Sequence, residues 1–174
     1  MTDESAKHGI RWRGQFLVVD ETPELRQDAY FRLAAQTQHF EIETGLFALF
    51  PRLLGTSPPY TLVLVPLVAT GRLSAPDEFV GDSLERWAAR HAPGYLGRFL
   101  YYGSRDLVQA APAGASVVEL PPNPSRRDIE RCEEAIDAAI ERIRVMLKER
   151  RKAARQARQA TLREGEEGQN GSRL

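Results

Sequence analysis

The sequence predicts an α/β fold: a small, largely parallel three-stranded sheet flanked by helices, followed by a long C-terminal helix that is amphipathic at first and basic afterwards. Two observations predict it. Three apolar runs of strand length are each followed by residues with helical spacing, an alternation that favours parallel strands joined by helices. After residue 123 the helical spacing continues, without a turn signal, for about 40 residues.

The first strand is predicted at residues 10–19, where apolar side chains alternate with polar ones and then run continuously. Such a pattern is typical of a strand that enters a buried sheet. Thr22 and Pro23 have the residue types of a helix N-cap and a first helical position. They predict a helix over residues 23–38.

The next segment is ambiguous, because residues 41–55 fit either a short helix or a strand broken at Pro51. The Val- and Leu-rich residues 60–70 predict the second strand. Pro66 lacks the amide proton that a sheet ladder uses, so we expect an edge or a bulge at this position.

Two helical pieces and the third strand follow. Ser74 and Asp77 have the spacing of a helix start, and this helix is predicted to end near residues 91–94. Residues 93–103 predict a second helical piece that closes at a C-terminal glycine. The third strand is predicted at residues 115–120, where two prolines end it.

A long helix is predicted over residues 124–163, with Ser125 and Asp128 as its start. Apolar residues then recur every three or four positions, in a seam that fits packing on the α/β body or self-association as a coiled coil in a homodimer. The residues of this seam are Ile129, Cys132, Ile136, Ala139, Ile143 and Met146.

The second half of the same helix is basic. Beyond Met146 the seam positions lose their bulk, since Arg150 and Ala153 come next. Nine Lys or Arg lie between Arg142 and Arg163 against one acidic residue, a net charge of +8. We expect this half to project and to bind an acidic protein surface or the phosphates of a nucleic acid. One face carries what we call the basic stripe: Arg144, Lys148, Arg151, Arg155 and Arg158.

Charge and composition divide the chain into four predicted parts. These are a flexible N-terminus at residues 1–9, the α/β body at 10–123, the long helix at 124–163 and a disordered acidic tail at 164–174. The net charge is −3 over residues 1–123, +5 over the helix and −2 over the tail, so the overall net charge of +0 sums unlike parts.

Several classes of protein are disfavoured by composition. Cys132 is the only cysteine, which rules out an intramolecular disulfide and a cysteine zinc framework and fits a cytoplasmic protein. The longest apolar run, residues 60–69, is about half the length of a membrane helix. We therefore expect no membrane partner, and no motif predicts a cofactor.

One acidic motif suggests a catalytic alternative. The stretch FLVVDE at residues 16–21 has the strand-then-acid pattern of nucleotide hydrolases, but the Gly-rich loop with Lys that they require is absent from the sequence. Asp20 could instead belong to a metal-dependent nuclease if other carboxylates converge on it. The candidates for that convergence are Glu41, Glu43, Asp77, Asp82 and Asp106.

The stretch RWAARH, from Arg86 to His91, resembles the Arg-to-His motif of the helical HEPN ribonucleases over six residues. The strand signals elsewhere contradict an all-helical domain, and on one helix these two side chains lie about 140° apart. His91 shares its face with Trp87, so we expect a buried, hydrogen-bonded histidine. The other histidines, His8 and His39, have no spacing that predicts a metal site.

Aromatic residues with two arginines nearby could form a stacking platform for nucleic-acid bases, although an aromatic stripe at helical spacing is more often part of a core. The aromatic residues concerned are Tyr95, Phe99 and Tyr102, with Arg98 and Arg105 beside them.

Taken together, these patterns favour a non-catalytic, cytoplasmic adaptor or small subunit of a larger assembly, which binds an acidic partner through the basic stripe. The first alternative is a nucleic-acid-binding protein that uses the same stripe. A metal-dependent nuclease centred on Asp20 is the second.

Overall fold

The computed structural model describes residues 14–20, 40–44, 46–54, 59–67, 80–121 and 123–170. Three expectations lie outside these residues: the flexible N-terminus, the helix over residues 23–38 and the helix start at Ser74. The chain forms two compact units, Met1–Ile140 and Glu141–Leu174, and each is described by itself.

The first unit contains a parallel sheet of five strands, in the order β2-β1-β3-β4-β5. The α/β class and the parallel pairing agree with the sequence prediction, but the prediction of three strands was wrong. This order is that of a doubly wound fold, in which the chain switches direction between β1 and β3. The strands are β1 (Gln15–Asp20), β2 (Phe40–Thr44), β3 (Tyr60–Pro66), β4 (Phe99–Gly103) and β5 (Val117–Glu119).

The ambiguous segment after residue 40 contains one of the two strands that the sequence patterns did not predict. Its first residues form β2, which pairs with β1 at the edge of the sheet. Its later residues form the helix α2 (Leu46–Leu53), with Pro51 inside its last turn. The segment is therefore a strand followed by a helix, and neither alternative described all of it.

The strand β4 is the second that was missed, because residues 93–103 were predicted as a helix. Only Pro93–Tyr95 is helical there, as a single 3-10 turn. All five residues of β4 are buried, as expected for a central strand covered on both faces. Gly103 ends this strand rather than a helix, and a Cβ there would lie 3.1 Å from the Leu67 Cβ.

Pro66 was expected at a sheet edge or a bulge, and this expectation was also wrong. The strand β3 is central, between β1 and β4. Pro66 is tolerated because it is the last residue of the strand, where the ladder ends opposite Tyr102. The register between β3 and β1 shifts at the other end of the strand, between Gln15 and Phe16.

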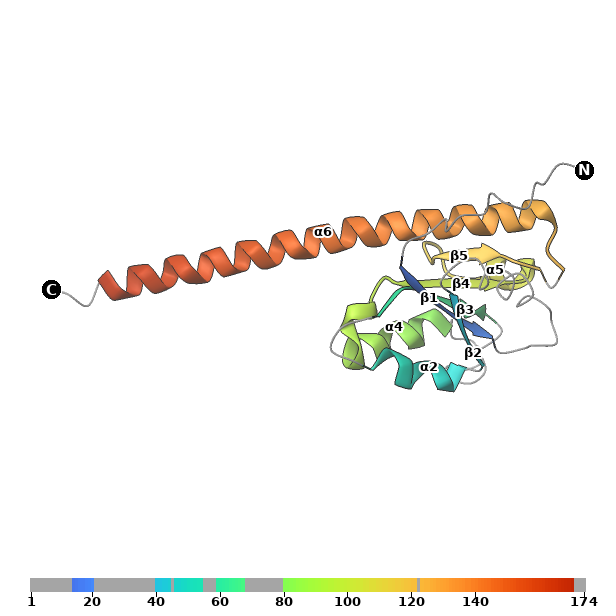
Figure 1. Ribbon diagram of the computed structural model, residues 1–174, viewed down its shortest axis with the longest axis horizontal. Coiled ribbons are helices and arrows are strands. Elements are labelled where there is room, and N and C mark those ends of the chain that lie inside the picture. The colour runs from blue at the N-terminus through green and yellow to red at the C-terminus, as the bar shows by residue number, and fades with distance from the viewer. Residues whose placement is uncertain are drawn as a thin grey trace, which may run out of the picture. The chain divides into compact units, whose positions relative to one another are not determined.

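Of the described helices, α2 and α4 (Val80–His91) cover one face of the sheet (Figure 1). A short helix that the sequence analysis missed, α5 (Arg105–Ala110), precedes β5. One core cluster joins the strands to α2 and α4, because alternate strand residues point to the same face. Its members include Leu17, Val19, Leu49, Leu53, Val63, Val65, Leu84, Ala88, Phe99 and Tyr101.

The C-terminal helix, α6 (Arg126–Asn170), has 45 residues and a length of about 68 Å. Its predicted start is confirmed: the Ser125 amide and hydroxyl donate to the Asp128 carboxylate at 2.8 and 2.6 Å, and the Asp128 amide donates to the Ser125 hydroxyl at 3.3 Å. The helix continues past Arg163 to Asn170, so residues 164–170, expected in a disordered tail, are helical.

The first part of α6, up to Ile140, lies on the sheet face opposite α2 and α4 (Figure 1). Arg131 reaches Glu119 of β5 at 4.0 Å. The rest of α6 forms the second unit, in which every side chain from residue 148 to 162 is exposed. None of the described helices is long and apolar enough to cross a membrane.

Candidate interaction surface

All five residues of the basic stripe are exposed on the second unit. Steps of four and three residues keep them within a sector of roughly 80° on a helix that turns about 100° per residue. Arg144 also donates to Glu141 at 2.9 Å, one helical turn away on the solvent-exposed surface. An exposed pair of this kind contributes little to stability, so it leaves the guanidinium accessible to a partner.

Four of the six seam residues are buried in the single chain. Cys132 and Ile136 are fully buried and Ala139 is 2% exposed, all of them in the first unit. Ile143 is also buried, whereas Ile129 and Met146, at the two ends of the seam, are half-buried. Burial raises the pKa of the Cys132 thiol to about 12, which keeps it protonated at neutral pH.

The carboxylates proposed for a nuclease do not converge among the described side chains. Arg52 holds both Glu43, at 2.9 Å, and Glu41, at 3.3 Å. The Tyr60 hydroxyl donates to Glu41 at 2.9 Å. No group of three potential metal ligands occurs in the part of the chain that the structure describes. Asp20 is the last residue of β1, and its side chain is outside the described ones.

The carboxyl edge of the sheet, where a doubly wound fold usually binds its ligand, is largely apolar around β3 and β4. The strand β3 runs into Pro66 and Leu67, which are both buried. The Tyr102 hydroxyl is turned inward and donates to the Val19 carbonyl at 2.5 Å. Among the described residues, this part of the edge is filled by buried packing side chains.

The resemblance of residues 86–91 to a ribonuclease motif does not produce a joint site. Arg86 donates to Ser83 at 3.3 Å, whereas the His91 ring packs on Trp87 with centroids 5.5 Å apart. His91 is exposed, so the expectation of a buried histidine was wrong. It is the last residue of α4, where the helix meets solvent.

The predicted aromatic platform is part of the core. Tyr95, Phe99 and Tyr102 are 2%, 3% and 2% exposed, so none presents a ring face to a base. The Tyr95 hydroxyl accepts from the Tyr60 amide at 3.5 Å. Burial raises the pKa of Tyr95, which is consistent with a structural phenol.

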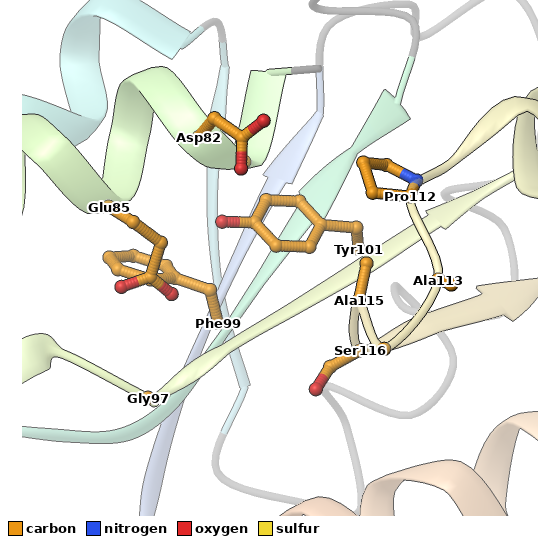
Figure 2. A pocket seen from close by; sticks show the side chains of 11 residues that line it. Asp82, Glu85, Gly97, Phe99, Tyr101, Pro112, Ala113, Ala115 and Ser116 are labelled. Atoms are coloured by element: carbon orange, nitrogen blue, oxygen red, sulfur yellow. The ribbon is translucent and has the colours of Figure 1, made fainter.

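A pocket of about 300 Å³ lies between α4 and the loop that precedes β5. Figure 2 shows the Tyr101 hydroxyl directed toward Asp82 and Glu85. Burial raises the pKa of Glu85, although a hydrogen bond with the Gly97 backbone opposes the shift. Burial and the two carboxylates raise the pKa of Tyr101 as well. The described lining therefore combines two carboxylates with a largely buried phenol.

A row of side chains on α2 and α4 was not recognised from the sequence. The rings of Phe47 and Phe50 are 6.5 Å apart, those of Phe50 and Trp87 are 4.5 Å apart, and His91 continues the row. The 3 and 4 spacing of Phe47, Phe50 and Leu54 was the available signal. We call Phe47, Phe50, Leu54, Trp87 and His91 the aromatic patch.

Comparisons with known proteins give a fold-level likeness alone. No protein-family model matches the chain, and no curated protein does. Among solved structures, the chain is similar to the non-phosphorylated HemR receiver domain from Leptospira biflexa. The identity is 17% and the TM-score 0.44, over 74% of this chain and 94% of that one.

Proposed function

We propose that the protein is a non-catalytic, cytoplasmic adaptor, or a small subunit of a larger assembly, that binds an acidic partner through the basic stripe. The observation that carries the proposal is a row of five exposed cations along one side of a continuous helix. A helix surface that serves only solubility ordinarily mixes both signs of charge. Here Glu149 is the single acidic residue between Arg142 and Arg163.

The dimensions of the stripe suit an extended anionic surface. From Arg144 to Arg158 the helix rises about 21 Å. Over that length a DNA duplex carries a charge roughly every 1.7 Å, and an acidic helix can present a carboxylate at each turn. Both kinds of partner can therefore meet all five cations at once.

A non-catalytic role is supported by the ion pairs that several carboxylates of the α/β body form. Arg52 neutralises the carboxylates of Glu41 and Glu43, and Arg131 lies 4.0 Å from Glu119. Carboxylates that are engaged in ion pairs are poor candidates for general bases, because a base must reach a substrate proton. The nuclease alternative centred on Asp20 gains no supporting contact from the described residues.

A nucleic-acid partner is the second candidate, and the residue types in the stripe favour it. Four of the five residues are arginines. A guanidinium binds phosphate through two parallel hydrogen bonds, which a lysine ammonium cannot do. If all five cations contact phosphates, log affinity should fall against log salt with a slope of about −3.5 to −4.5.

The experiment that tests the proposal compares the full chain with a truncation after Leu147, using fluorescence anisotropy with labelled single-stranded RNA, single-stranded DNA and duplex DNA. Salt-sensitive binding that is lost on truncation supports the nucleic-acid form. Binding to poly-glutamate but to none of the nucleic acids supports an acidic protein partner. If neither the nucleic acids nor poly-glutamate bind the full chain at low salt, the proposal is refuted.

A further inference from the structure

We propose that the aromatic patch on α2 and α4 is a second docking surface, and that it receives an acidic amphipathic helix of another protein. This inference goes beyond the basic stripe, since the patch lies in the first unit and the stripe in the second. An adaptor needs two surfaces that can be occupied together, and the chain provides one in each unit.

The patch combines anchored and exposed apolar side chains. Phe50 and Trp87 are half-buried and pack on the core cluster, which fixes the position of their rings. Phe47 and Leu54 are each 57% exposed, so more than half of each side chain contributes nothing to the core. Rigid rings with accessible apolar neighbours are typical of interface centres, where Trp and other aromatic residues are enriched.

The two helices place these side chains side by side. Phe47 and Phe50 lie one turn apart on α2, and Leu54 is the first residue after the end of this helix. Trp87 and His91 are one turn apart on α4, and the 4.5 Å contact between Phe50 and Trp87 joins the two rows. Two adjacent helices with apolar rows form the kind of surface into which a third amphipathic helix packs.

The charges around the patch select the partner. Arg86 and Arg90 are exposed on the solvent side of α4, next to Trp87, and His91 closes the same end of the helix. The acidic residues of α4, Asp82 and Glu85, line the separate pocket shown in Figure 2. A partner helix with carboxylates beside its apolar row complements this cationic rim.

A second copy of the chain fits less well than a different protein. A symmetric contact places the same patch of both copies together, so the arginine rims of the two copies would face each other. Like charges across an interface oppose association. The basic stripe of another copy is excluded as the occupant for the same reason.

The test uses the full chain with the stripe neutralised by Arg144→Gln, Lys148→Gln, Arg151→Gln, Arg155→Gln and Arg158→Gln, so that acidic probes bind there far less tightly. The probe is a labelled peptide of about 18 residues, five helical turns, with leucines at positions i, i+3, i+4 and i+7 and glutamates beside them. A scrambled peptide of the same composition and a peptide with lysines in place of the glutamates are the comparisons. Anisotropy is expected to show binding of the acidic helical peptide alone.

Variants locate the binding. Phe47→Ser with Leu54→Ser should weaken it at least tenfold, and Arg90→Glu should weaken it and reduce its salt dependence. Leu162→Ser, which removes another exposed leucine, is the matched control and should leave the affinity unchanged. Circular dichroism checks that each variant is folded, which is expected because the changed side chains are exposed.

Four outcomes, and vesicle binding as a fifth, overturn the proposal. They are equal binding of the scrambled or lysine peptide, no binding of the acidic peptide, and unchanged binding by the Phe47→Ser, Leu54→Ser variant. The fourth is light scattering that shows a dimer dissociated by that variant, which assigns the patch to a second copy. Binding of the chain to vesicles of anionic phospholipid, lost in the same variant, likewise replaces the proposed partner by a membrane surface.

Discussion

Replacing Ile136 by alanine should reveal whether the seam of α6 is part of the folded body. The Ile136 side chain is 0% exposed. The change removes three carbon atoms, worth about 2.4 kcal/mol of transfer free energy at about 0.8 kcal/mol each. A residual cavity adds to this cost, so we expect a loss of about 3 to 4 kcal/mol in the free energy of unfolding.

For a chain of this size, such a loss corresponds to a decrease of roughly 6 to 16 °C in melting temperature. Urea unfolding, followed by circular dichroism and by tryptophan fluorescence, measures the free energy, and Val145→Ala is the matched control on the same helix. Val145 is 52% exposed, so its truncation should change stability by less than about 0.5 kcal/mol. A stable Ile136→Ala protein that changes from dimer to monomer in light scattering would refute the reasoning, because the seam would then be intermolecular.

Three further predictions concern single positions. Ser125→Ala removes the N-cap of α6 and should lower the free energy of unfolding by about 1 kcal/mol. Because the Ser125 hydroxyl and amide lower the pKa of Asp128, an NMR titration should show a higher pKa for Asp128 in the variant. In the wild type, the Asp128 carboxylate stabilises the folded state at pH values above its ordinary pKa of 3.8. This stabilisation is lost as the pH falls through the lower pKa that Asp128 has in the folded protein. Cys132 should resist thiol reagents at pH 8 until the protein is unfolded. The free energy of unfolding should fall as the pH rises above 9, because the thiol ionises in the unfolded chain before it ionises in the folded one, where its pKa is raised to about 12. Gly14→Ala should destabilise the protein by more than Gly114→Ala does, since both have positive φ, of 122° and 88°, but an added Cβ meets Thr61 only at Gly14; equal melting temperatures would contradict this.

Much of the fold could be predicted because its signals are local. The strand at β3 and the strand at β5 are apolar runs bounded by prolines or by polar residues. The start of α6 depends on two residues, Ser125 and Asp128, whose side chains meet in the structure as their spacing predicts. Local chemistry of this kind is visible without knowledge of the partners in space.

The errors arose where tertiary packing decides between two local readings. The residues of β4 have aromatic spacing that fits a helix, but burial between β3 and β5 makes them a strand. Pro66 was read as an edge signal, whereas its place at the last position of a central strand removes the conflict. His91 was expected to be buried with Trp87, but the end of α4 leaves it exposed.

The two candidate surfaces differ in whether the sequence alone could reveal them. The basic stripe could be found from the sequence, because its residues lie on one helix and share one period. The aromatic patch could not, since it depends on the contact between Phe50 on α2 and Trp87 on α4, which are far apart in the chain. The pocket beside Tyr101 likewise combines α4 with the loop before β5.

The central claim is that the position of the cations on α6 matters, and not only their number. The most direct measurement compares two variants of the full chain that lose the same charge. Arg151→Gln, Arg155→Gln and Arg158→Gln remove three stripe residues, whereas Arg142→Gln, Arg150→Gln and Lys152→Gln remove three basic residues outside it. Both are titrated by anisotropy against the labelled polyanion that the wild type binds most tightly. We predict at least a tenfold loss of affinity for the stripe variant and a much smaller loss for the other. Equal losses would show that net charge alone drives binding and would contradict the claim.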